Sequence, residues 1–385
     1  MKRKLIVLGF CVMLLILFIQ IAFALKTEKP NAAERLQAKI QAMDPKNEMV
    51  DLRTLNRRTF KKKDGKMITF IASEPLNYLE DDNRLYPIDI NVTSEKPANA
   101  NKTGKSNEPN KYRHHVLKNS IKARFTDESN GGVQLEYQKH SIEFVLDHKN
   151  KRQATVDKNK IRFNKVFNNG DLIYTILPGQ VKDELIFSSP PKTPVISYKL
   201  KMSQKLTPQN GPKGSILLVD NTGKAVFELL PAFMFEKDNT SQCKDVETKF
   251  HWNKNELYCD MILDMSWLKD KKRHYPIVVD PIVSPAPTSS GKTENRTLIH
   301  CPEDWGTITC EIDLDGPGWH GNLASHSKSE VYFRDNMTGT KFLNYHDLNE
   351  YHPDPCTINI QAGHDYEVYL YGGKAHHIFA GNYTG

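Results

Sequence analysis

The sequence has none of the short motifs that mark the common hydrolases and zinc enzymes. It contains no G-x-S-x-G nucleophile turn and no H-x-H or H-E-x-x-H pair of zinc ligands. It also has only one long apolar run, at the amino terminus, so no second membrane-spanning helix is expected. Composition, periodicity and local patterns are therefore the guides to fold and function.

The amino terminus resembles an export signal. Basic residues at 2–4 precede an apolar stretch at 5–19, and Ala22-Phe23-Ala24 supplies the small-x-small step that signal peptidase accepts. We predict a signal peptide over residues 1–24 and a secreted or cell-surface protein. A retained anchor is the alternative, because the apolar stretch is long enough to cross a bilayer once. Contact with a membrane is expected only in that case.

Charge is distributed unevenly along the chain. The 385 residues carry a net charge of +7, yet residues 291–385 hold 6 Lys+Arg against 13 Asp+Glu. A basic front and an acidic back favour two domains, and an exported basic domain attracts anionic polymers. The alternative is that the Lys- and Asn-rich composition only keeps the domain soluble. The densest basic runs, at 61–63 and 269–273, are short and lack a recognition fold, so no nucleic-acid partner is expected.

Short runs of β-branched and aromatic residues, separated by Asn, Gly, Asp and Pro, dominate the chain from Met49 onward. They predict an all-β protein with two β-sandwich-like domains after the export signal and a short helix. The helix is predicted because Leu36, Ile40 and Met43 recur on one face. The predicted parts are an amphipathic helix or spacer at 25–46, a β-rich domain at 47–283, a Pro/Ser linker at 284–295 and an acidic, His-rich β-sandwich domain at 296–385.

Five blocks of the first domain carry a family resemblance. They are residues 52–60 (LRTLNRRTF), 85–89 (LYPID), 170–184 (GDLIYTILPGQVKDE), 225–232 (AVFELLPA) and 267–281 (WLKDKKRHYPIVVDP). In this order they make residues 47–285 resemble the N-terminal region of secreted bacterial wall-associated, YD-repeat (Rhs-like) proteins and of relatives with DNRLRE modules. The blocks alternate apolar and polar residues, with Pro and Gly at strand ends, so they describe a scaffold.

The resemblance implies a location at the cell surface. Members of the family carry this region ahead of repeat shells, carbohydrate-binding-like modules or toxin tips. The present sequence has no YD repeats, DNRLRE module, sorting signal or recognisable toxin tip. The contact-dependent toxicity of the family is therefore not expected of it.

Acidic and aromatic residues of the second domain are the candidates for a binding site. Asp313 and Asp315 share one strand face, and such a carboxylate pair near an aromatic ring could hold a sugar or Ca²⁺; capping a turn is the alternative. Aromatic rings pack against the apolar faces of sugars, although core packing explains any one ring equally well. The aromatic candidates are Trp305, Trp319, Tyr369 and Tyr371.

Eight of the 14 histidines lie in residues 291–385, where they could meet acids at a metal site. The weak candidates are His320, His364 and Asp365. Because no zinc-ligand spacing occurs, surface histidines are the favoured interpretation. No cofactor is therefore expected, with Ca²⁺ or another divalent metal as the exception that these residues would allow.

Cysteine positions suggest one disulfide in an oxidising setting. Cys310 and Cys356 each lie in phase with isoleucines of a predicted strand, so both can point into one core. Their pairing is predicted, and a bridge from Cys301 to Cys310 is the alternative. A bridge between Cys243 and Cys259 is not expected, because Cys259 lies in phase with core residues and Cys243 with acids.

These observations predict a non-catalytic secreted or cell-surface protein that serves wall association or adhesion. Its expected partner is a cell-wall polymer or a surface glycan. The alternative is a secreted hydrolase or metal-binding protein that uses the His- and Asp-rich second domain.

Overall fold

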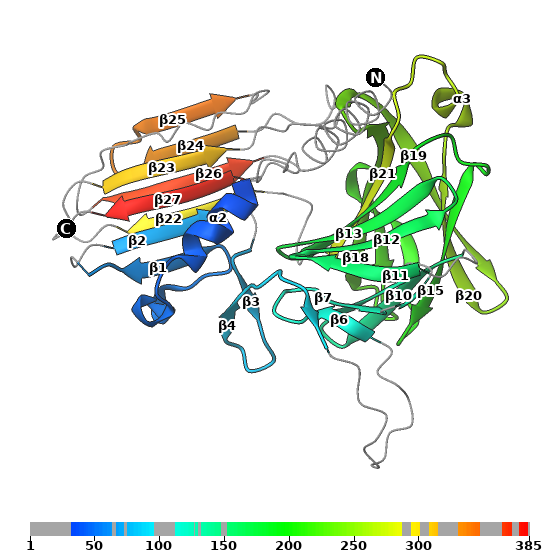
Figure 1. The fold of residues 1–385 in the computed structure, drawn as a ribbon. Helices are drawn as coiled ribbons and strands as arrows, with labels where there is room; N and C mark the ends of the chain where they lie inside the picture. The colour runs from blue at the N-terminus through cyan, green and yellow to red at the C-terminus, as the bar shows by residue number, and fades with distance from the viewer. Residues whose placement is uncertain are drawn as a thin grey trace, which may run out of the picture.

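The computed structural model describes residues 32–63, 67–72, 75–95, 112–126, 128–129, 132–147, 152–286, 294–300, 308–314, 330–346, 364–371 and 377–383. β-Strands dominate these segments and helices are few and short, which confirms the predicted all-β class (Figure 1). The predicted signal peptide at 1–24 lies outside the described residues. Within them, no helix is both long and apolar enough to span a membrane.

The predicted amphipathic helix is confirmed as α2 (Ala32–Gln41). Leu36 and Ile40, one turn apart, are buried against a cluster that includes Phe60 and Phe70. The 3₁₀ helices η1 (Pro45–Asn47) and η2 (Val50–Leu52) then lead the chain into β1. Burial of one apolar face thus fixes α2 against the first strands of the chain.

Two four-stranded sheets contain the first and the last strands of the chain (Figure 1). The first has the order β1 (Arg57–Lys61), β2 (Met67–Ala72), β27 (His377–Tyr383) and β23 (Ile308–Leu314). The second has the order β22 (Glu294–His300), β26 (Asp365–Tyr371), β24 (Glu330–Asp335) and β25 (Lys341–His346). Ile68 of β2 lies opposite Asn382 of β27, so one sheet joins segments from both sides of the predicted linker. The division into domains stays a prediction.

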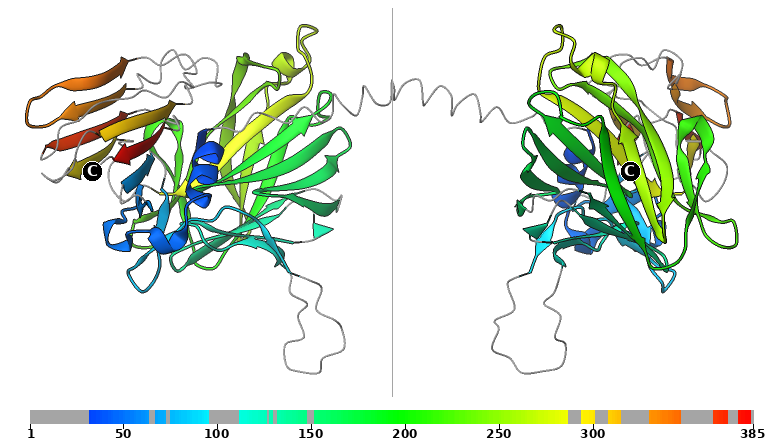
Figure 2. Two further views of the ribbon diagram at one scale, coloured as in Figure 1. Left: turned by 60° about the vertical axis from the view of Figure 1, so that its left-hand side comes forward. Right: turned by 90° about the vertical axis from the view of Figure 1, so that its right-hand side faces the viewer.

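The remaining long strands form a closed, barrel-like body, which we call the β-body (Figure 2). Its strands are β5 (Thr93–Ser94), β6 (Tyr112–Val116), β7 (Lys122–Thr126), β8 (Glu128–Ser129), β9 (Val133–Tyr137), β10 (His140–Leu146), β11 (Arg152–Asp157), β12 (Lys160–Phe167), β13 (Gly170–Leu177), β14 (Gln180–Phe187), β15 (Val195–Met202), β16 (Thr207–Asn210), β17 (Ile216–Val219), β18 (Ala225–Glu236), β19 (Asn239–Asn253), β20 (Glu256–Ile262) and β21 (Ile277–Pro285).

Smaller elements complete the described chain. β3 (Asn77–Leu79) and β4 (Leu85–Pro87) pair with each other, η3 (Pro212–Gly214) precedes β17, and α3 (Met265–Leu268) follows β20. The carboxylate of Asp264 caps α3 by accepting the backbone N–H groups of Ser266 and Trp267. Because β21 runs to Pro285 and β22 begins at Glu294, strands occupy both ends of the predicted linker at 284–295.

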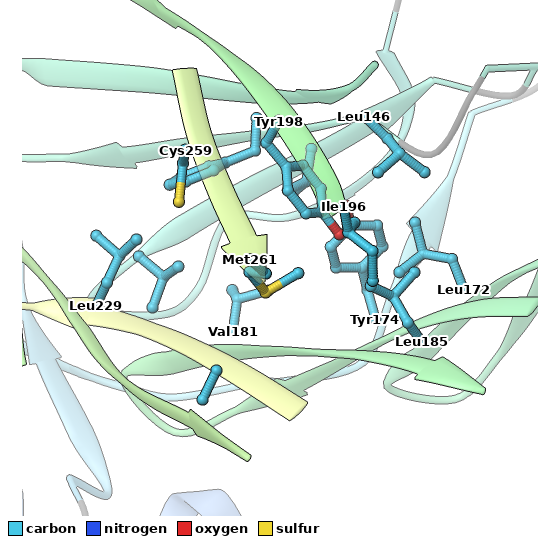
Figure 3. Packing of buried hydrophobic residues seen from close by; sticks show 14 of the residues in the cluster. Leu146, Leu172, Tyr174, Val181, Leu185, Ile196, Tyr198, Leu229, Cys259 and Met261 are labelled. Atoms are coloured by element: carbon cyan, nitrogen blue, oxygen red, sulfur yellow. The ribbon is translucent and has the colours of Figure 1, made fainter. Parts of the chain in front are cut away.

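The core of the β-body follows from strand alternation. In β14, Val181, Leu185 and Phe187 point inward and are fully or almost fully buried. They meet inward side chains of the facing strands, such as Ile196 and Met261 (Figure 3). Each large apolar side chain buried in this way contributes about 1.5–3 kcal/mol, so the β-body has ample apolar material to be stable.

Candidate functional site

Few of the predicted site residues fall in the described segments. Asp313 and Cys310 lie in β23, and Tyr369 and Tyr371 lie in β26; only their strand positions are described. The other members of the predicted sites lie outside the described residues, namely Trp305, Trp319, Asp315, His320 and Cys356. The Asp313–Asp315 pair and the Cys310–Cys356 disulfide stay predictions.

His364 contacts the carboxylate of Asp335, a residue far from it in the sequence. Its Nδ1 lies 2.7 Å from Oδ2 of Asp335, which is buried, whereas Asp365 begins β26. Burial raises the pKa of Asp335, but hydrogen bonds from His364 and from the backbone N–H of Met337 outweigh this and lower it overall. The described residues contain no group of three His, Cys, Asp or Glu side chains placed to hold a metal ion.

Cys243 and Cys259 are not bridged, as the sequence predicted. Cys259 is buried in the core of the β-body, and burial raises the pKa of its thiol well above the ordinary value. A thiol held protonated in this way is a poor nucleophile and serves as a small apolar side chain.

A carboxylate that the sequence analysis missed lies inside the β-body. Asp183 is in phase with the core residues of β14, and its Oδ2 accepts a hydrogen bond of 2.8 Å from the hydroxyl of Tyr198. Burial, reinforced by the nearby carboxylates of Asp280 and Glu184, raises the pKa of Asp183 to about 7, although the bond from Tyr198 opposes the shift. The ring of Tyr174 lies near that of Tyr198 (Figure 3), and burial, with a contribution from the carboxylate of Asp183, raises the pKa of the Tyr174 hydroxyl.

The space beside Asp183 is too small for a substrate. A cavity of about 40 Å³ lies among apolar side chains that include Leu135, Phe144 and Met261. This volume suits one or a few water molecules, since a single water needs roughly 10–15 Å³ measured in this way. Among the described residues, the space next to Asp183 therefore does not admit a large substrate.

Lys182 neutralises the acids that flank Asp183. Its Nζ lies 3.1 Å from both Oε1 of Glu184 and Oδ2 of Asp280. Burial lowers the pKa of Lys182, but the two carboxylates raise it overall, so this side chain stays charged. Such a buried, paired lysine is a structural feature.

The outer face of β15, β19 and β20 carries the described surface residues with the clearest chemistry. His251, Tyr258 and Lys199 form one cross-strand row, because His251 lies opposite Tyr258 and Tyr258 lies opposite Lys199. The rings of His251 and Tyr258 stack at 5.3 Å with an interplanar angle of 13°. The side chain of His251 remains 50% exposed, so a large substrate can reach it.

A carboxylate orients His251. Its Nδ1 lies 3.1 Å from Oδ2 of Asp260, whose Oδ1 accepts a hydrogen bond from Ser197. This arrangement directs Nε2 away from Asp260 and leaves it available for proton transfer. Ser197 contacts the carboxylate and not the imidazole, so the three residues do not form the chain of contacts of a serine nucleophile triad.

Cations flank the oriented histidine. Lys249 is exposed, lies two residues before His251 on the same strand face and pairs with Glu247 at 2.9 Å. Lys199 pairs with Glu256, and this hydrogen bond raises the pKa of Lys199 above its usual range. A histidine with a carboxylate behind it and lysines beside it can move a proton next to a phosphate group.

Sequence reasoning missed this arrangement, although the signal was present. Residues 247, 249 and 251 alternate with apolar positions, and Asn253-Lys254-Asn255-Glu256 predicts a hairpin turn between two strands. The cross-strand partners of His251 depend on the hairpin register, which the turn fixes. No contiguous sequence motif marks the site, because its residues come from three strands.

No protein-family model matches the sequence. The chain is 26% identical over 230 residues to the tRNA3(Ser)-specific nuclease WapA of Bacillus spizizenii, and the match covers 57% of this chain. It is similar to WapA proteins. The tRNA(Glu)-specific nuclease WapA of Bacillus subtilis subsp. natto and the tRNA nuclease WapA of Bacillus subtilis strain 168 match at the same identity and coverage. The match spans 9% of the length of these relatives.

These comparisons correct two predictions. The relatives are named nucleases, so the predicted non-catalytic role in wall association or adhesion is wrong. The alternative hydrolase or metal-binding protein did not foresee a nuclease either. The relatives act on tRNA by name, which also overturns the predicted absence of a nucleic-acid partner and the predicted glycan partner. The prediction rested on the basic runs at 61–63 and 269–273, whereas the correction comes from the similarity over 230 residues to proteins named as tRNA nucleases.

Proposed function

We propose that the protein is a nuclease that acts on tRNA and that it is exported from the cell or located at the cell surface. The observation that carries the proposal is the 230-residue similarity to three WapA proteins that are named tRNA nucleases. The basic residues at 2–4, the apolar stretch at 5–19 and the Ala22-Phe23-Ala24 step support export. The similarity to wall-associated proteins supports a location at the cell surface.

The outer face around His251 is the described surface that best fits this function. Cleavage of RNA needs a group that removes the proton of a 2′-hydroxyl and a positive charge beside the phosphate. His251 offers the first, with Asp260 as its orienting partner. Lys199 and Lys249 offer the second once a phosphate replaces Glu256 and Glu247, the carboxylates with which they pair in the free protein. The face is open, so a folded tRNA can approach it.

The proposed reaction is an internal displacement at phosphorus. The proton of the 2′-hydroxyl passes to Nε2 of His251 while the 2′-oxygen forms a bond to phosphorus. The bond from phosphorus to the 5′-oxygen breaks, and the leaving oxygen takes a proton from water; the hydroxide so formed then takes the proton from Nε2 of His251 and restores the neutral imidazole. The lysines stabilise the additional negative charge on the phosphate oxygens in the transition state.

The test is cleavage of tRNA by the purified full-length chain and by its His251→Gln variant. Total tRNA is incubated with each protein, with Mg²⁺ and separately with a chelator, and fragments are resolved on a denaturing gel. Removal of a general base is expected to slow cleavage about 10²–10⁴-fold. His274→Gln is the matched control, because His274 is 86% exposed and pairs with Glu236 away from this face.

The outcomes separate the function from its location. Slow cleavage by His251→Gln with normal cleavage by His274→Gln supports both. Equal cleavage by the two variants and the unmodified protein would support the nuclease function but would show that His251 is not its general base. Intact tRNA after incubation with the unmodified protein would refute the nuclease function itself.

A further inference from the structure

One end of the β-body is formed by four neighbouring turns. They connect β9 to β10, β15 to β16, β17 to β18 and β19 to β20. Contacts join them in space: the Nζ of Lys224 lies 3.3 Å from Oε1 of Gln138, and the backbone N–H of Ser141 donates to Oγ of Ser203 at 2.9 Å. The Nζ of Lys205 lies 5.7 Å from the ring centre of Trp252. The β19–β20 turn projects from the body at the lower right of Figure 1.

Each of the four turns presents one exposed lysine. They are Lys139, Lys205, Lys224 and Lys254, and we call them the turn lysines. Asp220 also lies at this end, and its Oδ1 accepts hydrogen bonds from the backbone N–H groups of Thr222 and Lys224. The hydroxyl of Thr222 also donates to Asp220, and this bond, followed by the two backbone bonds, lowers the pKa of Asp220. Two acids lie among these four exposed cations, Asp220 and Glu256, and Glu256 pairs with a further lysine, Lys199, so this end of the β-body is positive.

Trp252 is the large aromatic residue at this positive end. It lies opposite Leu257, which is 1% exposed, so the alternation of β19 directs it toward the core side of the hairpin. At the end of the strand it extends past the core, and 44% of the residue is exposed. An exposed indole with an ammonium group above it has the composition of a stacking platform for an unpaired base.

The end and the outer face are continuous through one hairpin. Trp252 and His251 are adjacent in β19 and point to opposite faces of it. An RNA strand that passes around the tip of this hairpin would therefore contact Trp252 on one face and the row of His251, Tyr258 and Lys199 on the other. Duplex RNA hides its base faces, so the ligand that fits is a single-stranded segment such as a loop or an end.

We propose that the turn lysines and Trp252 form a subsite for single-stranded RNA, in which Trp252 stacks on an unpaired base and the lysines contact the phosphates on either side. The inference rests on the proposed tRNA function and adds the location and the kind of RNA segment. Lysine supplies point charges to phosphates without reading sequence, so this subsite selects unpaired structure and not a base.

The test measures binding of tRNA, a 12-nucleotide unstructured RNA and a 12-base-pair RNA duplex to the full-length chain by fluorescence anisotropy. Trp252→Ala is expected to weaken binding of the unstructured RNA about tenfold, in keeping with the loss of one stacked base. Trp252→Phe retains a ring and should recover most of the affinity. The duplex should bind more weakly than the unstructured RNA and respond little to Trp252→Ala.

The contribution of the turn lysines is tested by measuring the affinity for the unstructured RNA at several salt concentrations. Replacing all four by Gln should reduce the slope of log affinity against log salt by about 3, because each phosphate contact on a single strand contributes roughly 0.7. Lys271→Gln with Lys272→Gln is the control, since these exposed lysines follow α3 at the opposite end of β20. The far-ultraviolet circular dichroism of every variant is recorded to establish that it is folded.

Three results are decisive. Weaker binding of the unstructured RNA by the turn-lysine and Trp252→Ala variants, with unchanged binding by the Lys271→Gln, Lys272→Gln control, supports the subsite. Unchanged binding in both, with tRNA still bound and cleaved, would refute the subsite and leave the proposed function standing. Failure of the unmodified chain to bind or cleave tRNA would refute both.

Discussion

The buried carboxylate of Asp183 should make the stability of the β-body depend on pH near neutrality. Its pKa rises from an ordinary 3.8 to about 7 in the folded chain. A carboxyl group whose folded pKa is raised opposes folding once it ionises. Its cost is therefore absent below about pH 4, grows between pH 4 and 7 and is complete above pH 7. With 1.36 kcal/mol for each pKa unit, the complete cost is about 4 kcal/mol.

The perturbation is Asp183→Asn, which keeps an oxygen that can accept the hydroxyl of Tyr198 and removes the ionisation. Urea unfolding of both proteins at pH 5 and pH 8, followed by tryptophan fluorescence, gives the free energies of unfolding. The asparagine leaves N–H groups in an apolar site, and this costs about 1–3 kcal/mol at either pH. The difference between the two proteins should nevertheless shift by about 2–3 kcal/mol in favour of the asparagine variant from pH 5 to pH 8.

Tyr198→Phe provides the opposite perturbation. It removes the donor that stabilises the ionised carboxylate, so it should destabilise the β-body more at pH 8 than at pH 5. A pH dependence that is the same in the unmodified protein and in Asp183→Asn would refute the assignment of the transition to Asp183.

Two further predictions concern the fold. Glu48 is buried between Arg53 and Arg58; burial raises its pKa, but hydrogen bonds from both guanidinium groups lower it overall to about 2. The stability that ionised Glu48 contributes is present above about pH 4.5 and is lost as the pH falls toward 2. In urea unfolding at pH 7, Glu48→Gln should therefore lower the free energy of unfolding by about 3 kcal/mol. An unchanged free energy of unfolding would contradict this. Gly170→Ala should lower the stability by about 1–3 kcal/mol, because an added Cβ would lie 2.8 Å from the ring of Phe187 and 3.3 Å from the carbonyl oxygen of Ile186. A thermal midpoint equal to that of the unmodified protein would show that the ring moves aside freely.

The elements themselves were largely predictable because their signals are local. The short β-branched and aromatic runs that predicted an all-β protein include β2 (Met67–Ala72), and the recurrence of Leu36 and Ile40 predicted α2. Turn residues such as Asp220-Asn221-Thr222-Gly223 marked the hairpins, and Gly223 does take a positive φ of 81° there. The inward position of Asp183 was not predicted, although this residue is in phase with the buried Val181 and Leu185.

The all-β class, the short helix and the faces of individual strands could be predicted from the sequence, because these follow from side-chain periods of 2 and 3.6 residues. Three features could not be predicted and became visible in the folded chain: β2 pairs with β27, Asp183 is enclosed with Tyr198, and His251 contacts Asp260 beside Lys199. Each of these depends on which strands become neighbours. That choice is made by the packing of the whole core and not by the residues beside each strand.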